Sequence, residues 1–421
     1  MFVENRKKVT KQLELKSIAI LNSNDVLPSN ADGTMPFIQN SDLFWLCGID
    51  QEDTILVLCH NQINKQMREI LFIKKTNEHI AVWEGAKLTK KEASNISGVS
   101  SVFWTSELED ILEKVLSSSD AIYLNRNIHS RATKVVQTRD DRFKTKITNK
   151  YPNKKIKELA PILHEMRVVK SQKEVELINK ACKITEKGFR RILPIIKPGI
   201  MEFEIEAELI HEFIVSRSRR FAYQPIIASG KDSCVLHYTA NNKACREGDL
   251  LLMDFGAEYA NYASDMTRTV PVNGRYSLRQ KNVYNSVLRV MKSAIKMLTV
   301  GTLLKEYNKQ VGILMENELV KLGVLDNHDI KKQDAKNPLY KKYFMHGTSH
   351  YLGLDVHDVG SLEWPIKAGM IFTCEPGIYL PNENIGVRLE NDILITDDGQ
   401  KDLMASIPIE TEEIEELMHQ K

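Results

Sequence analysis

Hydrophobic and polar residues change their spacing several times along the first 125 positions of the chain. Short apolar runs at 17–21, 54–59, 69–73 and 79–83 have the length and composition of strands. The segment 106–116 instead places its apolar residues at helical spacing. This alternation predicts a small α/β domain in the N-terminal part of the chain.

A polar, strongly charged stretch follows at 138–159, with a proline near its middle. We interpret it as the connection between two domains, and a solvated surface helix within one domain is the alternative. We therefore expect an N-terminal domain at 1–160 and a second domain at 161–421. A chain of 421 residues also exceeds what one hydrophobic core usually organises.

The second domain begins with a clear helix start. Ser171 and Glu174 have the spacing of a capping box, and apolar residues then recur at helical spacing as far as Ile192. Later, Gly199 and Gly301 each mark a turn that leads into a further helical pattern. These patterns predict several long helices in this domain.

Two strand-like segments of the second domain, 246–259 and 367–380, align without a gap, and the alignment places Asp254 on Glu375. Each acid stands six residues after an aligned glycine, Gly248 or Gly369, at the end of an apolar run. A second carboxylate follows in each copy, Asp265 in the first and Glu390 in the second. We interpret this as a duplicated α+β half with an internal pseudo-two-fold, although short apolar runs also resemble one another by chance. The four acids would then converge where the halves meet.

Four buried carboxylates at one place repel each other unless cations balance them. Two divalent cations would supply the four positive charges that this balance needs. Arg388 stands two residues before Glu390, so that on a strand both side chains point to one face. We therefore expect Arg388 to hold that carboxylate, with an exposed ion pair as the alternative.

A glycine-rich stretch, HGTSHYLGLDVHDVG, carries His346, His350 and His357. The first two stand four apart, like two ligands on one helix face. Each glycine costs a helix interior about 1 kcal/mol, however, so we expect a loop or strand that lines a cleft. A ligand set of four carboxylates and one imidazole favours Mn²⁺. Two such ions would lower the pKa of a water shared between them to roughly 7, and a water activated in this way indicates a hydrolase.

Composition narrows the class of protein. A hydrophobic content of 42% and a charged content of 27% are typical of a soluble globular protein. The net charge of +2 gives no electrostatic reason to expect a nucleic-acid partner. The six cysteines lack paired spacing, and no apolar run has the length of a signal peptide or a membrane span, so we expect a cytoplasmic protein without a membrane partner.

The chain resembles aminopeptidase P, the Xaa-Pro aminopeptidases of the pita-bread metallopeptidases. The motifs that carry the resemblance cover most of the chain and are highly specific in this order: QNSDLFWLCGID, AVWEGAKLT, HEMRVVKSQKEVELI, MDFGAEYANYASDMTRTVPVNG, FMHGTSHYLGLDVHDVG, EPGIYL and GVRLEND. The resemblance implies a creatinase/prolidase-like N-terminal domain and a pita-bread catalytic domain. It also implies hydrolysis of peptides with an N-terminal Xaa-Pro by a water that bridges two divalent ions.

The resemblance implies five metal ligands. Asp254 would chelate one ion, and Asp265 and Glu390 would bridge both. His350 and Glu375 would complete the shell of the second ion. Glu375 would also pass a proton from the bridging water to the leaving nitrogen.

The resemblance further implies substrate contacts. His237 and His346 would lie around the peptide backbone and the proline ring, and His357 would donate to the scissile carbonyl as charge develops there. Asp42 matches an acid of the family's N-terminal domain that reaches an active site, either its own or that of a neighbouring subunit. The resemblance separately implies a homodimer or homotetramer, built partly through the N-terminal domain. Four other histidines lack such neighbours and are interpreted as structural: His60, His79, His164 and His211.

Two departures from the family pattern lie at the rim of the expected cleft. Ile38 stands where relatives carry arginine, and the stretch between Glu375 and Glu390 is shorter than in many of them. Both concern peptide length rather than the chemistry. A prolidase, or Xaa-Pro dipeptidase, shares the ligands and is the nearest alternative. A metal-free peptide-binding module is the alternative from another class, but such proteins typically lose ligands, and all five are present here.

Overall fold

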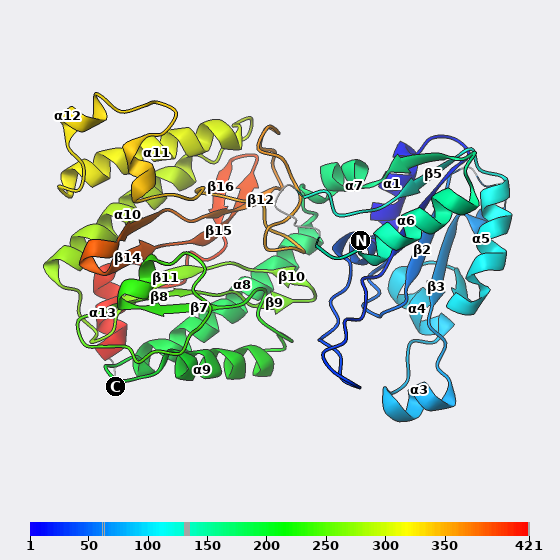
Figure 1. The fold of residues 1–421 in the computed structure, drawn as a ribbon, viewed down its shortest axis with the longest axis horizontal. Helices are drawn as coiled ribbons and strands as arrows, with labels where there is room; N and C mark the ends of the chain where they lie inside the picture. Colours follow the sequence, from blue (N-terminus) through cyan, green and yellow to red (C-terminus); the bar gives the residue numbers. More distant parts are fainter. Residues whose placement is uncertain (61, 63, 130–134, 420–421) are drawn as a thin grey trace. The chain divides into compact units, whose positions relative to one another are not determined.

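The computed structural model describes residues 1–60, 62, 64–129 and 135–419 (Figure 1). The chain divides into two compact units, Met1–Arg167 and Val168–Lys421. The boundary expected at residue 160 lies ahead of helix α7 (Ala160–Arg167), which packs against α1 (Phe2–Gln12) in the first unit.

The first unit is built on a six-stranded mixed sheet of order β4-β3-β2-β1-β5-β6. In chain order the strands are β1 (Ser17–Asn22), β2 (Ile55–Cys59), β3 (Glu69–Ile73), β4 (Ser101–Trp104), β5 (Ala121–Leu124) and β6 (Lys155–Glu158). Its other helices are α2 (Ser41–Cys47), α3 (Glu78–Trp83), α4 (Lys90–Ser97), α5 (Leu108–Ser117) and α6 (Arg139–Lys150). Apolar side chains of α5 and α6 pack on those of β1, β2, β3 and β5 in one buried cluster, so the predicted α/β domain is confirmed.

Two segments of the first unit differ from the sequence prediction. The run 79–83, expected as a strand, belongs to α3, because Asn77 caps the helix by accepting a backbone N–H three residues on. The charged segment 138–159 does not connect two domains but supplies α6 and the edge strand β6. Ile147 of α6 is buried in the core, so one apolar position outweighs the polar character of the segment.

The second unit has helices on both sides of its sheets. Its helices are α8 (Gln172–Ile192), α9 (Glu202–Val215), α10 (Leu278–Met297), α11 (Leu304–Lys321), α12 (Asn327–Ile330) and α13 (Thr411–His419). The predicted capping box of Ser171 is present at the start of α8, and Gly199 and Gly301 turn the chain with φ of 92° and 90°. In Figure 1 the pair α8 and α9 lies on one side of the strands and the pair α10 and α11 on the other.

Two three-stranded sheets of the second unit have the orders β11-β8-β7 and β12-β15-β16. The antiparallel pair β8 and β11 corresponds to the pair β12 and β15, whereas the third strand joins β8 in one sheet and β15 in the other. Their strands are β7 (Ile226–Ser229), β8 (Leu250–Asp254), β11 (Thr267–Pro271), β12 (Ile371–Cys374), β15 (Asn391–Thr396) and β16 (Gly399–Asp402). The remaining strands form two hairpins, β9 (Glu258–Tyr259) with β10 (Tyr262–Ala263) and β13 (Gly377–Leu380) with β14 (Ile385–Arg388). Gly248 and Gly369, the aligned glycines ahead of β8 and β12, have φ of 84° and 88°, as expected for two copies of one half.

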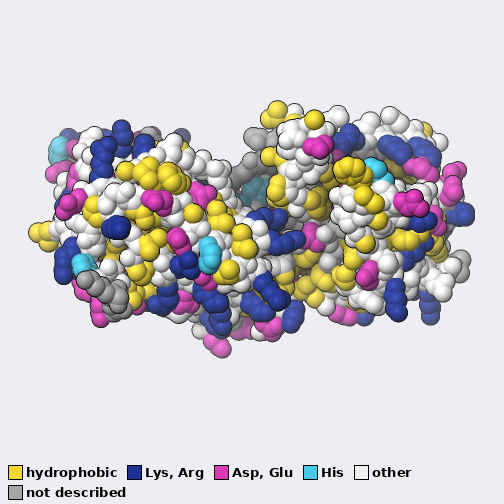
Figure 2. Space-filling view, turned by 90° about the horizontal axis from the view of Figure 1, so that it is seen from below, with side chains coloured by type: hydrophobic (Ala, Val, Ile, Leu, Met, Phe, Trp, Pro, Cys, Tyr) yellow, Lys and Arg dark blue, Asp and Glu magenta, His cyan; other side chains and the backbone are white. Residues whose placement is uncertain are grey.

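The surface carries charges of both signs. Lys and Arg side chains and Asp and Glu side chains are spread over the face in Figure 2, with hydrophobic side chains between them. Among the described residues, no helix combines the length and the hydropathy needed to cross a membrane. All six cysteines are free thiols, and only Cys234 among them is partly exposed, which agrees with the absence of paired spacing in the sequence.

Candidate metal centre

Four carboxylates stand at matching ends of two antiparallel strand pairs. Asp254 ends β8, and Asp265 stands two residues before its partner strand β11. Glu375 directly follows β12, and Glu390 directly precedes the partner strand β15. The pairing therefore brings the two acids of each copy to the same end of their strands. Three of the acids are buried, and Glu375 has the most exposed side chain, at 19%.

Asp265, His350 and Glu390 form the tightest grouping. Each offers one ligand atom, and these three atoms lie within 4.8 Å of one another. Nε2 of His350 lies 3.4 Å from Oδ2 of Asp265 and 3.7 Å from Oε1 of Glu375. Nδ1 of His350 lies 3.0 Å from the carbonyl oxygen of Tyr351. In the neutral ring this carbonyl keeps the proton on Nδ1, so that Nε2 presents a lone pair toward the acids.

Tyr223 connects Asp254 to this grouping. Its hydroxyl lies 2.5 Å from Oδ1 of Asp254 and 2.5 Å from Oδ1 of Asp265. Burial raises the pKa of Tyr223 well above its usual range, and the two carboxylates add to this, so the phenol stays protonated. Tyr223 was not predicted from the sequence, because the segment that leads into β7 shows no motif that marks a contact with residues 31 and 42 positions later.

Arg388 is a buried cation within the acidic group. Its Nη2 donates to Oδ2 of Asp254 at 2.6 Å, and its Nη1 donates to the hydroxyl of Tyr379 at 2.9 Å. The expectation that Arg388 holds Glu390 is wrong. β14 ends at Arg388, whereas Glu390 leads into β15 of a different sheet, so strand alternation does not run through both. Glu390 instead accepts from the hydroxyl of Thr267 at 2.6 Å.

Negative charge exceeds positive charge at this site, because four acids face the guanidinium of Arg388 and the imidazole of His350. Burial raises the pKa of Glu375 to about 7, with His350 opposing and Asp265 adding to the shift. Burial also raises the pKa of Glu390 well above its usual range, and the charges of Asp265 and Glu375 add to it. Burial lowers the pKa of His350, but Asp265 and Glu375 outweigh it and raise the pKa to about 9. An excess of buried carboxylate charge beside an available imidazole fits divalent cations.

His346 lies at the edge of the acidic group. Its Nε2 lies 2.8 Å from the hydroxyl of Tyr379, and its Nδ1 lies 3.6 Å from Oε2 of Glu375. Burial lowers the pKa of His346 to about 3, and the charges of Arg388 and His237 add to the shift, so the ring is neutral. His237 itself has an exposed side chain. The structure therefore places His346 at this site, and His237 lies near enough for its charge to act on His346.

His357 stands next to the metal-ligand candidate His350. The two ring centroids are 4.0 Å apart, and the side chain of His357 is exposed. The stretch 346–360 contains no helix, and its one bridge pairs Tyr351 with Phe372 of β12. The prediction of a non-helical segment along a cleft wall is confirmed in its first part, because the histidines are carried by a loop that borders β12.

Asp42 lies in the first turn of α2, in the first unit. Its carboxylate accepts from Nη1 of Arg167 at 2.7 Å and from Nδ2 of Asn125 at 2.8 Å. The side chains of Asp42 and Arg167 are 9% and 3% exposed. This buried ion pair ties α2 to the end of α7 within the first unit, and a part for Asp42 in substrate binding stays a prediction.

Both units match models of known protein families. The model of metallopeptidase family M24 matches residues 176–397, and that of the aminopeptidase P N-terminal domain matches residues 2–123. An Xaa-Pro aminopeptidase of Haemophilus influenzae is 34% identical, and the match covers 99% of this chain and 97% of that protein.

Two solved structures have the same fold. The zinc-substituted Escherichia coli aminopeptidase P in complex with product has a TM-score of 0.88 at 32% identity, covering 99% of this chain and 97% of that one. The proline aminopeptidase P II of Yersinia pestis has a TM-score of 0.89 at 30% identity, covering 99% and 98%. These matches confirm the pita-bread architecture and favour neither the prolidase nor the binding-module alternative. The chain therefore belongs to the aminopeptidase P proteins of metallopeptidase family M24, which makes it a metal-dependent exopeptidase.

Proposed function

We propose that this chain releases the N-terminal residue from peptides that carry proline in the second position, with two Mn²⁺ ions as its cofactors. The observation that supports this most strongly is the convergence of four acids and one imidazole from the ends of two like strand pairs. The names of the relatives, Xaa-Pro aminopeptidases, support the substrate class.

The proposed ligands of the two ions are Asp254, Asp265, His350, Glu375 and Glu390. Bound ions would polarise the scissile carbonyl and supply hydroxide at neutral pH. A donor set with four carboxylates and a single imidazole favours Mn²⁺ over zinc, since zinc sites usually contain more nitrogen and sulfur. Arg388 donates to Oδ2 of Asp254 and the hydroxyl of Tyr223 bonds to its Oδ1, and these two contacts fix the orientation of the carboxylate.

Glu375 is the proposed proton carrier. Its side chain is the most exposed of the four acids, so a substrate can reach it, and His346 stands 3.6 Å from its Oε2. A carboxylate in this place can take a proton from the nucleophilic water and give it to the leaving nitrogen. The same side chain thus serves both halves of the hydrolysis.

Recognition of proline follows from what its nitrogen lacks. A proline nitrogen carries no N–H, so an enzyme cannot identify this bond by accepting that proton. The proposed contacts are therefore to the other groups of the peptide: His357 donates to the carbonyl oxygen as charge develops, and His237 and His346 line the backbone and the ring. Anchoring of the free α-amine limits the reaction to one residue at a time.

The test is Mn²⁺-supplemented hydrolysis of a matched pair, an Xaa-Pro dipeptide and an Xaa-Pro-Yaa tripeptide. We expect cleavage of the tripeptide by the wild type and none by Glu375→Ala. Glu318→Ala, which removes a buried acid of α11 outside the site, is the matched control and should keep the activity. Cleavage of the dipeptide alone would make the protein a dipeptidase. Cleavage of neither peptide by the metal-bound protein would refute the proposal.

We also propose a cytoplasmic location and a homodimer or homotetramer. The six free thiols support a reducing compartment. Exposed apolar side chains of α3, Val82 at 79% and Trp83 at 75%, support a protein contact through the first unit. Light scattering coupled to size exclusion measures the subunit number, and a monomer at micromolar concentration would contradict the oligomer.

A further inference from the structure

The segment 229–243, called the His237 loop below, leaves β7 and carries His237 toward the acidic site. It packs directly on β14, the strand that ends at Arg388. Oγ of Ser233 accepts from the backbone N–H of Gly386 at 2.9 Å. A Cβ on Gly386 would lie only 2.1 Å from the carbonyl oxygen of Ser233, so the contact leaves no room for a side chain. The position of His237 therefore depends on what holds this loop against β14.

Glu202, the first residue of α9, collects four donors from the His237 loop. Its Oε1 accepts from the backbone N–H and the hydroxyl of Ser229, at 2.9 and 2.7 Å. Its Oε2 accepts from the hydroxyl of Tyr238 at 2.9 Å and from the backbone N–H of Lys243 at 3.0 Å. These donors come from the start, the middle and the end of the loop, so one carboxylate closes it.

The chemistry of Glu202 suits this task. Its side chain is fully buried, and a buried carboxylate is stable when hydrogen bonds satisfy both oxygens. Its place at the N-terminus of α9 adds the favourable field of the helix. A carboxamide has only one acceptor oxygen, so glutamine at this position would retain two of the four contacts and oppose an N–H group to the backbone donor of Lys243.

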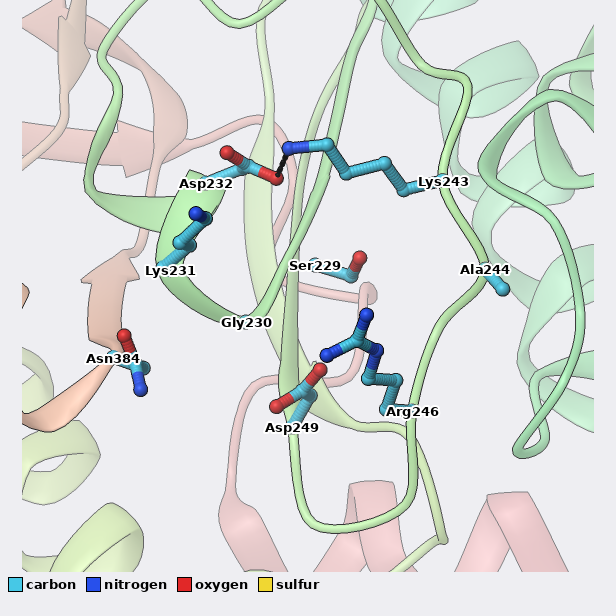
Figure 3. A pocket seen from close by; sticks show the side chains of 9 residues that line it. All are labelled: Ser229, Gly230, Lys231, Asp232, Lys243, Ala244, Arg246, Asp249 and Asn384. Atoms are coloured by element: carbon cyan, nitrogen blue, oxygen red, sulfur yellow. Dashed lines mark hydrogen bonds and ion pairs between the residues drawn. The ribbon is translucent and has the colours of Figure 1, made fainter.

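A second connection between the ends of the loop is weaker. Figure 3 shows Lys243 reaching across to Asp232 at the rim of a cavity of about 420 Å³, with Ser229 at the base between them. The side chain of Lys243 is 47% exposed, and an ion pair of that kind contributes little. The buried side chain of Asn241 also anchors the end of the loop, since it accepts from the backbone N–H of Ile227 and donates to the carbonyl of Pro225. Only Glu202 among these groups binds the start, the middle and the end of the loop at once.

We propose that Glu202 is a positioning residue of the hydrolysis, which acts on the peptide through His237. Tyr238 is the direct link, since it is the neighbour of His237 in the chain and donates to Glu202. This inference rests on the proposed function in one respect, namely that His237 contacts the substrate. The closure of the loop by Glu202 is independent of that function.

Hydrogen exchange of the full-length, Mn²⁺-loaded protein, followed by mass spectrometry, tests the closure without any use of activity. Glu202→Ala should raise the exchange rate of residues 229–243 about tenfold or more and leave the protection of residues 371–374 in β12 unchanged. The metal content should also stay the same, because none of the proposed ligands lies in the loop. Unchanged exchange of the loop in this variant would overturn the inference.

A double-mutant cycle tests the action through His237. Glu202→Ala should lower kcat/KM for an Xaa-Pro-Yaa peptide about 10- to 100-fold, in line with a displacement of about 1 Å at a substrate contact. In the His237→Ala background the same change should cost less than about threefold. An equal loss in both backgrounds would overturn the inference. If the wild-type enzyme did not cleave the peptide, the proposed function would be refuted instead. The hydrogen-exchange experiment would still decide whether Glu202 closes the loop.

A milder pair of variants guards against misfolding of Glu202→Ala. Tyr238→Phe removes one donor to Glu202 and should lower kcat/KM and loosen the loop in the same sense, by a smaller factor. Tyr284→Phe removes the hydroxyl of another buried tyrosine, which donates to the carbonyl of Ile409 at 2.7 Å, far along the chain from the loop. The control should change neither readout, and equal effects of the two variants would contradict the proposal.

Discussion

We expect that Glu375, one of the proposed metal ligands, destabilises the folded protein when the metal is removed. In the metal-free protein its partly buried carboxylate lies near Asp265 without the cation that the site favours. Burial raises its pKa from 4.5 to about 7, although His350 opposes the shift. The folded state therefore binds this proton more tightly than the unfolded state does. It follows that the stability of the metal-free protein falls as the pH rises from about 4.5 to about 7 and that the penalty is constant above this range.

The size of the penalty follows from the two pKa values. At 1.36 kcal/mol for each pKa unit, ionising Glu375 in the folded protein costs about 3 kcal/mol at pH 8 and about 1 kcal/mol at pH 5. Glu375→Gln keeps the shape of the side chain and cannot ionise. The variant should therefore be more stable than the wild type in the absence of metal, by about 2 kcal/mol more at pH 8 than at pH 5.

The assay is urea unfolding in the presence of EDTA, at pH 5 and pH 8, for the wild type and Glu375→Gln. Glu318→Gln is the control with the opposite sign. Burial raises the pKa of Glu318, but Arg289 and Lys321 outweigh it and lower the pKa, so this acid stabilises the fold above its usual pKa and the variant loses stability at pH 8. A Glu375→Gln variant that is less stable than the wild type at pH 8 would refute this account of the charge at the site.

Three further predictions concern residues that contact the acids of the site or the stretch 346–360. Arg388→Met should weaken Mn²⁺ binding about 10- to 100-fold in a calorimetric titration, because Asp254 loses the guanidinium that orients it; unchanged affinity would show that the contact is dispensable. Tyr223→Phe should lower kcat/KM for an Xaa-Pro-Yaa peptide about tenfold at saturating Mn²⁺, since Oδ1 of Asp254 and Oδ1 of Asp265 lose the hydroxyl that lies between them; wild-type kinetics would contradict this. Lys170→Met should cost about 3–5 kcal/mol in urea unfolding, because Lys170 and Asp358 form an ion pair with side chains only 1% and 2% exposed; a loss below 1 kcal/mol would mean that the pair is not buried in solution.

The sequence predicted the acids because their chemistry conflicts with their surroundings. Asp254 stands in an apolar strand and Glu375 follows another one, and such positions keep a carboxylate only when a cation or donors satisfy it. The aligned glycines gave an independent reason to pair the two segments, and their like φ values agree with that pairing. Both features lie within short segments of the sequence, so they can be recognised before the fold is known.

Residues that reach the site over long sequence distances left no such signal. Tyr223 and Glu202 are ordinary residues in their own segments, and only the folded chain shows which carboxylates or donors they meet. The prediction that Arg388 holds Glu390 was wrong for a related reason. Alternation along a strand predicts which face a side chain occupies, but the chain passes from one sheet to another between Arg388 and Glu390, and the rule ends there.

The distribution of the acids over the two copies also determines how metal binding acts on the fold. Asp265 precedes β11 in the first copy, whereas His350 and Glu390 belong to the second, and their ligand atoms lie within 4.8 Å of one another. Without a cation, burial raises the pKa of Glu390 and the charge of Asp265 adds to the shift, so the two carboxylates disfavour each other's ionised form across the two copies. A cation held by all three residues would replace that repulsion with attraction across the pseudo-two-fold, and it would bind the folded unit in preference to the unfolded chain. Metal that is needed for the chemistry therefore also stabilises the joint between the two copies.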